Sequence, residues 1–367
     1  MNEDSDSNDE TPAPVARPPK SEQEPASSEL VEIAPNIVRM QLPIDMPGLG
    51  HVNCYILEDD RGLALVDPGL PDETSFRTLS DRLASFGASV QNVHTVIVTH
   101  SHPDHFGGYR HIANATDDVA LITHESFRDR MKMDEMRENL DFDSLEPSTM
   151  TIEELREAFK RSTPWGKQFS PPDMALERFQ RHGRESFASF RLPEPTQRVS
   201  DGTVIELAGR EWVSVHTPGH TADHLCLSDP GETVMLSGDH VLPSITPHIG
   251  GITPQQDPLA EFFNSLDRMH EFNDVELVLP AHGKLFSDLP GRADDIKEHH
   301  VERLDAIREI ADEIGEADVN SYMQRLFRER SWGEMAESET YAHLEHLRIM
   351  GDAVAGESAG LRTCAPA

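Results

Sequence analysis

The sequence feature that most limits the fold is a histidine-rich loop directly after an apolar segment. Residues 93–99 (VHTVIVT) have the length and composition of a buried strand. They lead into the run His100-Ser101-His102-Pro103-Asp104-His105-Phe106-Gly107-Gly108. Chance placement at this histidine content would give such a pattern roughly 0.004 times per chain. A strand that ends in a polar loop is typical of the ligand-binding edge of an open α/β sheet, so we expect an α/β fold with a site at that edge.

The chemistry of this loop indicates metal binding. Neutral imidazole and carboxylate are ligands that suit zinc and its first-row neighbours. His100 and His102 alternate, so both side chains can point the same way from an extended loop, while Asp104 and His105 turn toward a second position. This spacing can serve two metal ions. A cluster of solvated histidines is the structural alternative.

Three further ligand candidates follow predicted strands later in the chain. His220 lies in a Pro-Gly turn after residues 211–216, Asp239 follows the apolar run 233–236, and His282 follows 276–279. Each of these alone is more often structural than a ligand. Because all three are expected at the carboxyl ends of strands, they extend the ligand set of the histidine loop.

The remaining pattern divides the chain into regions. Residues 1–30 hold eight acidic and two basic residues and predict a disordered acidic tail. We expect one α/β domain over 31–295, with a helix at Glu73–Phe86 and a helical insertion over 124–195, including helices at Glu125–Asn139 and Ile152–Lys160. The insertion is either a subdomain with its own core or a lid over a substrate pocket. Three helices (His299–Ile314, Asp318–Arg330, Ser338–Met350) and a short β wing predict a winged-helix-like domain over 296–367.

These motifs, in this order, resemble those of the metallo-β-lactamase fold superfamily over about residues 35–290. The resemblance implies an αββα sandwich. The sequences around His220–His224 and Gly238–Leu242 are most similar to a branch with a C-terminal winged-helix domain, which includes an endoribonuclease and many hydrolases of unassigned substrate; the dinuclear site also resembles that of glyoxalase II. The acidic tail and the insertion are not general features of the family.

The resemblance also assigns roles to residues. It implies that one metal ion is held by His100, His102 and His220, that a second is held by Asp104, His105 and His282, and that Asp239 bridges the two. The run Leu65-Val66-Asp67-Pro68-Gly69 resembles the family's early strand-to-loop motif, whose aspartate supports a ligand. We expect support for the ligand imidazoles from Asp67, Ser101 and Thr221. Candidates for substrate contact are Tyr109, Trp165 and His248, with His240 as another cleft residue.

The expected activity is hydrolysis by a hydroxide that bridges two divalent ions, zinc foremost, with iron and manganese also fitting the ligands. The substrate would be an acyl thioester, ester or lactone of a small molecule. Asp104 and Asp239 are the catalytic candidates, with Asp104 passing a proton to the leaving group. An endoribonuclease or phosphodiesterase of the same fold and a non-enzymatic metal-binding scaffold are the alternatives. Asp239 argues against classical zinc β-lactamases, His102 against flavodiiron proteins, and the second ligand set against one-iron sulfur dioxygenases.

Charge and composition limit the partners. The 32 basic and 66 acidic residues give a net charge of 32 − 66 = −34, which disfavours polyanions such as nucleic acid and anionic membranes. Residues 296–355 carry seven basic and 14 acidic residues, a net of −7, so the C-terminal domain is expected to pack or to form a homodimer rather than to bind DNA. Three widely spaced cysteines and an N-terminus without a signal-peptide pattern predict a cytoplasmic protein.

Overall fold

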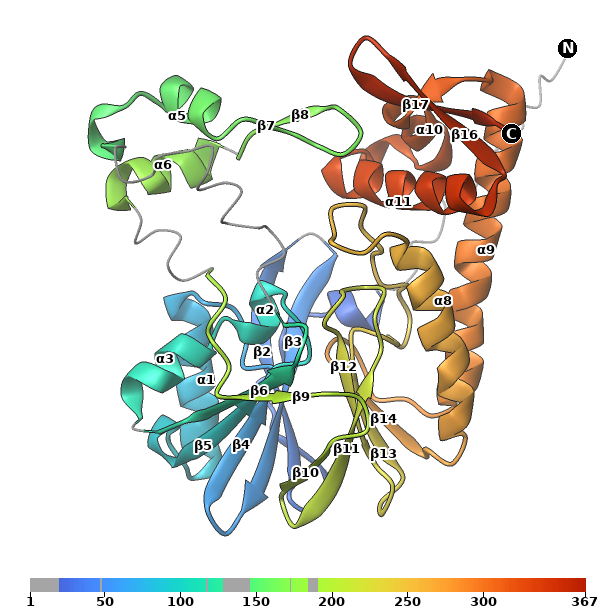
Figure 1. The fold of residues 1–367 in the computed structure, drawn as a ribbon. Coiled ribbons are helices and arrows are strands. Elements are labelled where there is room, and N and C mark those ends of the chain that lie inside the picture. The colour runs from blue at the N-terminus through green and yellow to red at the C-terminus, as the bar shows by residue number, and fades with distance from the viewer. Residues whose placement is uncertain (1–19, 47, 117, 128–145, 172, 184–190) are drawn as a thin grey trace, which may run out of the picture.

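The computed structural model describes residues 20–46, 48–116, 118–127, 146–171, 173–183 and 191–367. The helix expected at Glu125–Asn139 therefore lies mostly outside the described residues. Two β-sheets pack face to face, and helices cover the outer face of each sheet (Figure 1). This confirms the predicted αββα arrangement.

The two sheets are consecutive in the chain. The first has the strand order β1-β2-β3-β4-β5-β6-β9 and the second the order β10-β11-β12-β13-β14. The first contains β1 Val31–Ala34, β2 Ile37–Met46, β3 Leu49–Asp59, β4 Gly62–Val66, β5 Val93–Ile97, β6 Ala120–His124 and β9 Gln197–Val199. The second contains β10 Val204–Leu207, β11 Arg210–His216, β12 Leu225–Asp229, β13 Val234–Gly238 and β14 Leu277–Pro280.

Helices α1 Glu73–Phe86, α2 Pro103–Phe106 and α3 Tyr109–Ala115 belong to the first half, and α8 Pro258–Arg268 and α9 Leu289–Ile314 to the second. Short 3₁₀ helices lie at Ser21–Gln23, Val90–Asn92, Pro147–Thr149, Met269–Phe272 and Glu329–Ser331.

Alternation of side chains along the strands explains the four layers. In β4, Ala64 and Val66 belong to the apolar cluster between the sheets, whereas Leu65 belongs to the cluster under the helices of the first half. In β12, Leu227 faces the other sheet and Cys226 faces the helices of the second half. Because both faces of these strands are buried, they read as nearly continuous apolar runs.

Helix α1 shows how local sequence sets an element. The carboxylate of Asp72 accepts hydrogen bonds from the backbone N–H groups of Thr74 and Ser75, at 2.9 and 3.0 Å, and so caps the first turn. The helix ends at Gly87, whose φ of 89° is left-handed. The helix predicted at Glu73–Phe86 is confirmed with the same bounds.

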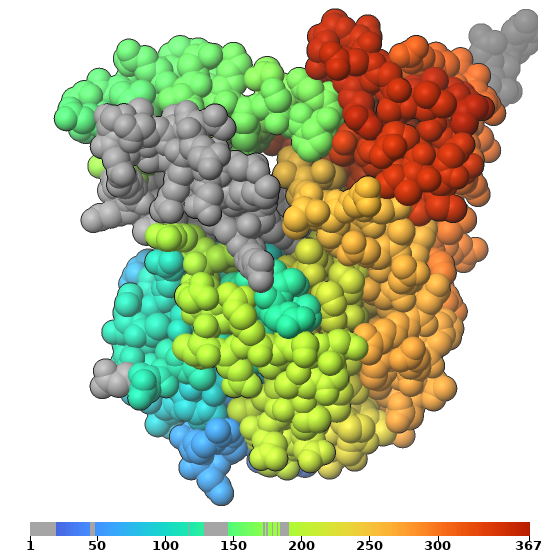
Figure 2. All heavy atoms as spheres, in the orientation of Figure 1, coloured from blue at the N-terminus to red at the C-terminus, as the bar shows by residue number. Residues whose placement is uncertain are grey.

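The insertion has a small core of its own. It contains α5 Ile152–Ala158, the hairpin β7 Arg161–Ser162 and β8 Gln168–Phe169, and α6 Asp173–His182. Its core is formed by Leu155, Phe159, Leu176 and Phe179. The green hairpin reaches the red C-terminal domain in Figure 2, where Arg362 donates a backbone hydrogen bond of 3.1 Å to Trp165. The described part is thus a subdomain that connects to the C-terminal domain.

The C-terminal region consists of three helices and a small sheet. It contains α9, β15 Ala317–Asp318, α10 Val319–Leu326, α11 Glu334–Met350, β16 Ala353–Ser358 and β17 Leu361–Pro366, with strand order β15-β17-β16. The boundary expected between residues 295 and 296 falls inside α9. Buried residues recur along the whole helix, from Leu289 to Ala311, and they join the second sheet and the C-terminal region in one apolar cluster.

The N-terminal segment differs from the expected tail. Residues 20–30 are described and lead into β1, and the side chain of Glu22 is fully buried. Within the described part of the chain, none of the helices is both long and apolar enough to cross a membrane.

Candidate metal centre

The predicted ligands come together at one edge of the sandwich. The loops that carry them follow β5, β11, β13 and β14, and Asp67 directly follows β4. β4 runs parallel to β5, and β13 runs parallel to β14, so the carboxyl ends of these strands lie at a common edge. The seven side chains fall into two groups whose candidate ligand atoms lie within 4.8 Å of one another.

The first group contains His100, His102, His220 and Asp239. The Nδ1 atom of His102 lies 2.8 Å from Nε2 of His100 and 3.1 Å from Nε2 of His220. The Oδ2 atom of Asp239 lies 3.9 Å from Nε2 of His100 and 3.6 Å from Nε2 of His220. Three ring nitrogens and one carboxylate oxygen therefore surround a single point.

The second group contains Asp104, His105 and His282. The Oδ2 atom of Asp104 lies 3.4 Å from Nε2 of His105 and 3.5 Å from Nε2 of His282. Asp239 also reaches this group, because its Oδ2 lies 3.7 Å from Nε2 of His105 and its Oδ1 lies 3.3 Å from Nε2 of His282. Asp239 is thus shared by both groups.

The buried polar atoms of the second group fit a cation. Nε2 of His105, Nε2 of His282 and Oδ1 of Asp239 are buried and have no hydrogen-bond partner among the residues that the structure describes. Polar atoms left in this state carry a desolvation cost, which a bound metal ion would offset. Nitrogen and carboxylate donors also match the ligand preferences of zinc.

Polar side chains orient two of the histidines from behind. The Oγ1 of Thr99 lies 3.0 Å from Nδ1 of His100, and Nδ1 of His105 lies 2.8 Å from Oδ2 of Asp67. Thr99 in turn donates a 2.8 Å hydrogen bond to Asp67. Since Nδ1 is the donor in each case, the Nε2 lone pair points into the centre. Asp67 itself has a φ of 54°, a left-handed conformation that such a hydrogen-bonded site can hold.

Backbone carbonyl groups orient the other two Nε2 ligands. Nδ1 of His220 donates to the carbonyl oxygen of His248 at 2.7 Å, and Nδ1 of His282 donates to that of His51 at 2.7 Å. Neither His51 nor Thr99 was predicted to have a role in the site. Thr99 stands next to the histidine loop, but the part of His51 that contacts a ligand is its main chain, which leaves no signal in the sequence.

His224 supports the bridging aspartate without being a ligand candidate. Its Nε2 accepts a 3.0 Å hydrogen bond from the backbone N–H of Asp239, and its Nδ1 lies 2.7 Å from Oγ1 of Thr217. Burial, together with the nearby His240, holds the pKa of His224 well below its usual value, so the ring is neutral. His224 stands in the motif His220–His224, but no role was predicted for it.

The other expected supporting residues lie in the same region. The hydroxyl of Ser101 donates to Asp223 at 3.0 Å and so connects the histidine loop to the loop of His220. Thr221 is fully buried next to His220 in the chain.

The glycines after the histidine loop are explained by close packing, because a Cβ at Gly108 would overlap the carbonyl oxygen of Pro68.

The electrostatic environment differs between the groups. Burial, with His105 and His102 nearby, holds the pKa of His100 well below its usual value. Burial would also lower the pKa of His105, but Asp104 and other carboxylates outweigh burial and hold that pKa well above its usual value. Burial would raise the pKa of Asp239, yet the surrounding histidines hold it well below its usual range, so the shared carboxylate is ionised.

The three candidates for substrate contact lie in different environments. Tyr109 begins α3 and is 9% exposed. His248 lies beside the centre through its carbonyl, while its side chain faces Glu339 at 3.4 Å. Trp165 packs with its ring centroid 5.3 Å from that of Tyr341 and donates a 3.2 Å hydrogen bond to Glu337. The structure thus places Trp165 against the C-terminal domain, and its contact with substrate stays a prediction.

A third set of potential ligands, His300, Glu339 and His343, lies in the C-terminal domain, and its members form hydrogen bonds with one another. Nδ1 of His300 lies 3.0 Å from Nε2 of His343, whose Nδ1 donates to the carbonyl of Glu339 at 2.7 Å. The Glu339 carboxylate is paired with Arg303 and lies near His248. These contacts account for the set as a hydrogen-bonded core.

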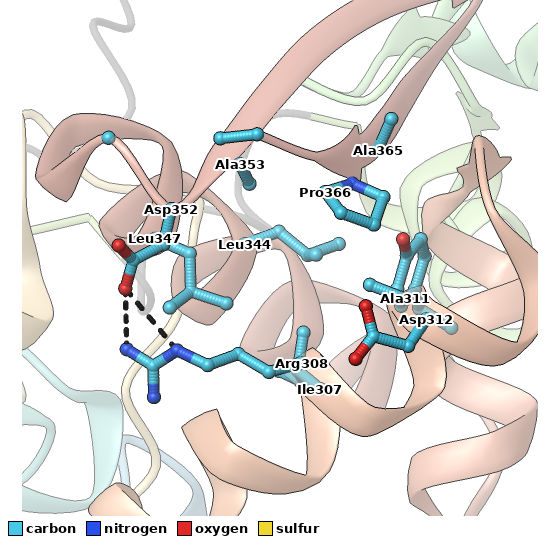
Figure 3. A pocket seen from close by; sticks show the side chains of 13 residues that line it. Ile307, Arg308, Ala311, Asp312, Leu344, Leu347, Asp352, Ala353, Ala365 and Pro366 are labelled. Carbon is cyan, nitrogen blue, oxygen red and sulfur yellow. Dashed lines mark hydrogen bonds and ion pairs between the residues drawn. The ribbon is translucent and has the colours of Figure 1, made fainter.

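A cavity of about 430 Å³ also lies in the C-terminal domain, between α9, α11 and the β16–β17 hairpin (Figure 3). Arg308 forms a 2.7 Å ion pair with Asp352 at this cavity. None of the seven ligand candidates lines it.

Comparisons with known proteins agree with this geometry. The family model described as "Metallo-beta-lactamase superfamily" matches residues 47–282. A "Beta-lactamase-like protein 2 homolog" of Caenorhabditis elegans is 25% identical over 285 residues, which cover 77% of this chain and 73% of the relative. An "Atrochrysone carboxyl ACP thioesterase" of Aspergillus chevalieri is 31% identical over 117 residues, covering 31% of this chain and 35% of that protein. A beta-lactamase domain protein from Burkholderia ambifaria has a similar structure, with a TM-score of 0.71 and 25% identity, over 94% of this chain and 95% of the other.

Proposed function

Because this chain belongs to the metallo-β-lactamase superfamily, we propose that it is a hydrolase with two divalent metal ions that cleaves an acyl thioester, ester or lactone of a small molecule. His100, His102 and His220 would hold one ion, and Asp104, His105 and His282 the other. Zinc is the proposed metal, since three imidazoles and a carboxylate match its preferred ligands; iron and manganese are the alternatives.

The observation that carries this proposal is the position of Asp239. Its two oxygens lie 3.3 to 3.9 Å from the Nε2 atoms of four histidines, two from each group. A carboxylate between two sets of imidazoles is the arrangement that brings two cations close enough to act on one substrate. Two such ions would supply an acidified water as nucleophile and Lewis-acid stabilisation of the developing oxyanion.

The residues of the chain would perform the remaining steps. Asp104 would carry the proton, because its buried carboxylate lies beside the histidines of the second group, with Oδ2 3.4 Å from Nε2 of His105 and 3.5 Å from Nε2 of His282. It would accept a proton as the nucleophile forms and deliver it to the leaving sulfur or oxygen as the acyl bond breaks. Thr99, Asp67 and the carbonyls of His51 and His248 would keep the ligand rings fixed during this change. The surrounding burial would limit access of bulk water.

The substrate class rests on two supports. A relative named as an acyl-carrier-protein thioesterase matches 31% of this chain at 31% identity. The net charge of −34 repels polyanions such as RNA.

The proposal is tested by assaying the purified, metal-loaded protein against a panel of acyl thioesters and lactones of different chain length, and separately against labelled single-stranded RNA. We expect turnover of at least one acyl substrate that Asp239→Ala abolishes. RNA cleavage that depends on Asp239, with no acyl turnover, would replace this function by the phosphodiesterase alternative. Neither activity in a protein that retains two ions would favour the scaffold alternative.

The C-terminal domain is proposed to act in packing or self-association rather than in nucleic-acid binding, whether or not its helices and hairpin form a true winged helix. Several large apolar side chains are exposed on it, namely Trp332, Met335, Ile349, Met350 and Val354. Analytical ultracentrifugation of the full chain distinguishes a homodimer from a monomer.

We also propose a cytoplasmic location, which is supported by three free, buried cysteines.

A further inference from the structure

The described N-terminal segment crosses the back of two ligand loops. Residues 20–24, which we call the N-terminal strap, form a short 3₁₀ turn over Ser21–Gln23 before the chain continues toward β1. The strap contacts the loop after Asp239 and the loop of His282, both of which follow strands of the second sheet. A segment rich in acids, which sequence composition predicts to be disordered, is thus bound beside the centre.

Glu22 fastens the strap to the loop that follows Asp239. Its carboxylate accepts hydrogen bonds from the backbone N–H groups of Ser244, at 2.7 Å, and Ile245, at 3.0 Å, and from the Ser244 hydroxyl. Arg292 of α9 holds the same loop from another side, because it donates to the carbonyl oxygens of Leu242 and Ile245 at 2.7 and 2.8 Å. Glu22 is fully buried, so removing its carboxylate would leave these donors without an acceptor.

Close packing fastens the strap to the residue after His282. Gly283 has a φ of 81°, and a Cβ there would lie 2.6 Å from Oγ of Ser21 and 3.1 Å from Cγ of Glu22. The backbone N–H of Lys284 donates to Oγ of Ser21 at 3.3 Å. Glycine is needed at position 283 for its backbone conformation and for this close approach.

His51 connects the strap to the ligand itself. Its Nδ1 donates to the carbonyl oxygen of Glu24 at 2.7 Å, and its Nε2 accepts a 3.2 Å hydrogen bond from the N–H of Gly283. These two contacts assign the tautomer, because a carbonyl oxygen can only accept and a backbone N–H can only donate. The carbonyl of His51 then accepts the Nδ1 hydrogen bond of His282.

We propose that the N-terminal strap is a positioning element for the second metal group, and that Glu22 is the positioning residue that holds it in place. The inference rests on the proposed two-metal function. The strap orients His282 through His51 and Gly283 and fixes the loop after Asp239 through Ser244 and Ile245. None of the strap contacts described above involves His248 or Thr99, the residues that support histidines of the first group.

The test compares Glu22→Ala and Glu22→Gln with Glu29→Ala in the full chain. Glu29 is an exposed acid in the same N-terminal segment and serves as the matched control. Stepwise zinc affinities are measured by competition with a chromophoric chelator, and the cobalt-loaded proteins are compared by absorption spectroscopy. Glu22→Ala is expected to weaken the second ion by about 10- to 100-fold and to change the cobalt spectrum of that site, with a smaller loss at the first ion, which shares Asp239.

Glu22→Gln is expected to give a smaller loss, since the amide oxygen can still accept a hydrogen bond, and it is used if Glu22→Ala does not fold. Glu29→Ala is expected to match the unsubstituted protein. Unchanged affinities in both Glu22 variants, or an equal loss at both ions, would overturn the inference while leaving the proposed function intact. If the unsubstituted protein binds only one zinc ion, the proposed two-metal function and this inference both fail.

Discussion

The two halves of the metal centre take their support from different parts of the chain. In the first half, His220 donates to the carbonyl of His248, whose side chain faces Glu339 of the C-terminal domain. In the second half, His282 donates to the carbonyl of His51, whose ring contacts the N-terminal strap. The sandwich brings the ligands to one edge, and the C-terminal domain and the N-terminal strap contact the side chains of His248 and His51, whose carbonyls orient His220 and His282. The two halves can therefore be perturbed separately, except at Asp239.

The largest effect is expected at Asp239, which belongs to both halves. Asp239→Ala should lower the metal content from two ions to less than one per chain and reduce acyl hydrolysis by about 10³-fold or more, because nucleophile formation and oxyanion stabilisation both depend on the ions. Elemental analysis and initial rates measure the two effects, and circular dichroism checks the fold. Retention of two ions would show that this carboxylate does not bridge them.

The next largest effects separate the halves. His102→Ala removes a ligand from the first half and His282→Ala removes one from the second, so each variant should retain about one ion and lose most activity. Both should keep the helical C-terminal domain folded. If His102→Ala still holds two ions per chain by elemental analysis, the assignment of His102 is wrong.

Asp67→Asn should affect the second half alone and by a smaller amount. Asparagine tolerates the left-handed backbone of Asp67, but it removes the charge that orients His105. We expect the affinity for the second ion to fall by about 10- to 100-fold. Chelator competition measures it, and Glu29→Ala again serves as a control. An equal loss for the first ion would mean that Thr99, which joins Asp67 to His100, couples the halves.

His248→Ala should produce a weaker effect, confined to the first half. The carbonyl that His220 contacts remains, but the loop loses its side-chain contact with Glu339. We expect the affinity for the first ion to fall by about fivefold, since this residue acts one step away from a ligand. A raised KM with unchanged metal affinity would instead identify His248 as a substrate contact.

The smallest effect on the metal centre is expected from protonation of His343, which lies in the C-terminal domain and acts on the stability of the fold. Burial lowers the pKa of His343 to about 4, so the unfolded chain binds more protons than the folded chain between pH 4 and about 6.5. Stability should therefore fall as the pH falls from about 6.5 to 4, by up to about 3 kcal/mol for this group. Thermal unfolding across this range should show a shallower slope for His343→Asn. An unchanged slope would contradict a buried neutral ring.

The candidate ligands could be predicted from the sequence because each follows an apolar strand. Such strands end at a sheet edge, and the residue after the strand, such as Asp239 after β13, is placed there by the backbone. The αββα layers were implied by the family resemblance, and the doubly buried strands agree with them. The insertion's own core was also foreseeable, since residues 124–195 hold seven of the 15 phenylalanines, Phe159 and Phe179 among them.

The supporting contacts could not be predicted in the same way. His51 and His248 act through backbone carbonyls, which every residue carries. Glu22 stands among eight acids in the first 30 residues, and only the fold shows that it is the buried one. The start of α9 could not be predicted either: the sequence indicated a helix from His299, whereas α9 begins at Leu289 and accepts a proline in its first turn.

The most direct test of the two-metal centre is anomalous X-ray scattering from crystals of the zinc-loaded protein, recorded on either side of the zinc edge. The account predicts two peaks, one among His100, His102 and His220 and one among Asp104, His105 and His282, with Asp239 between them. A single peak, or a second peak away from His282, would contradict it.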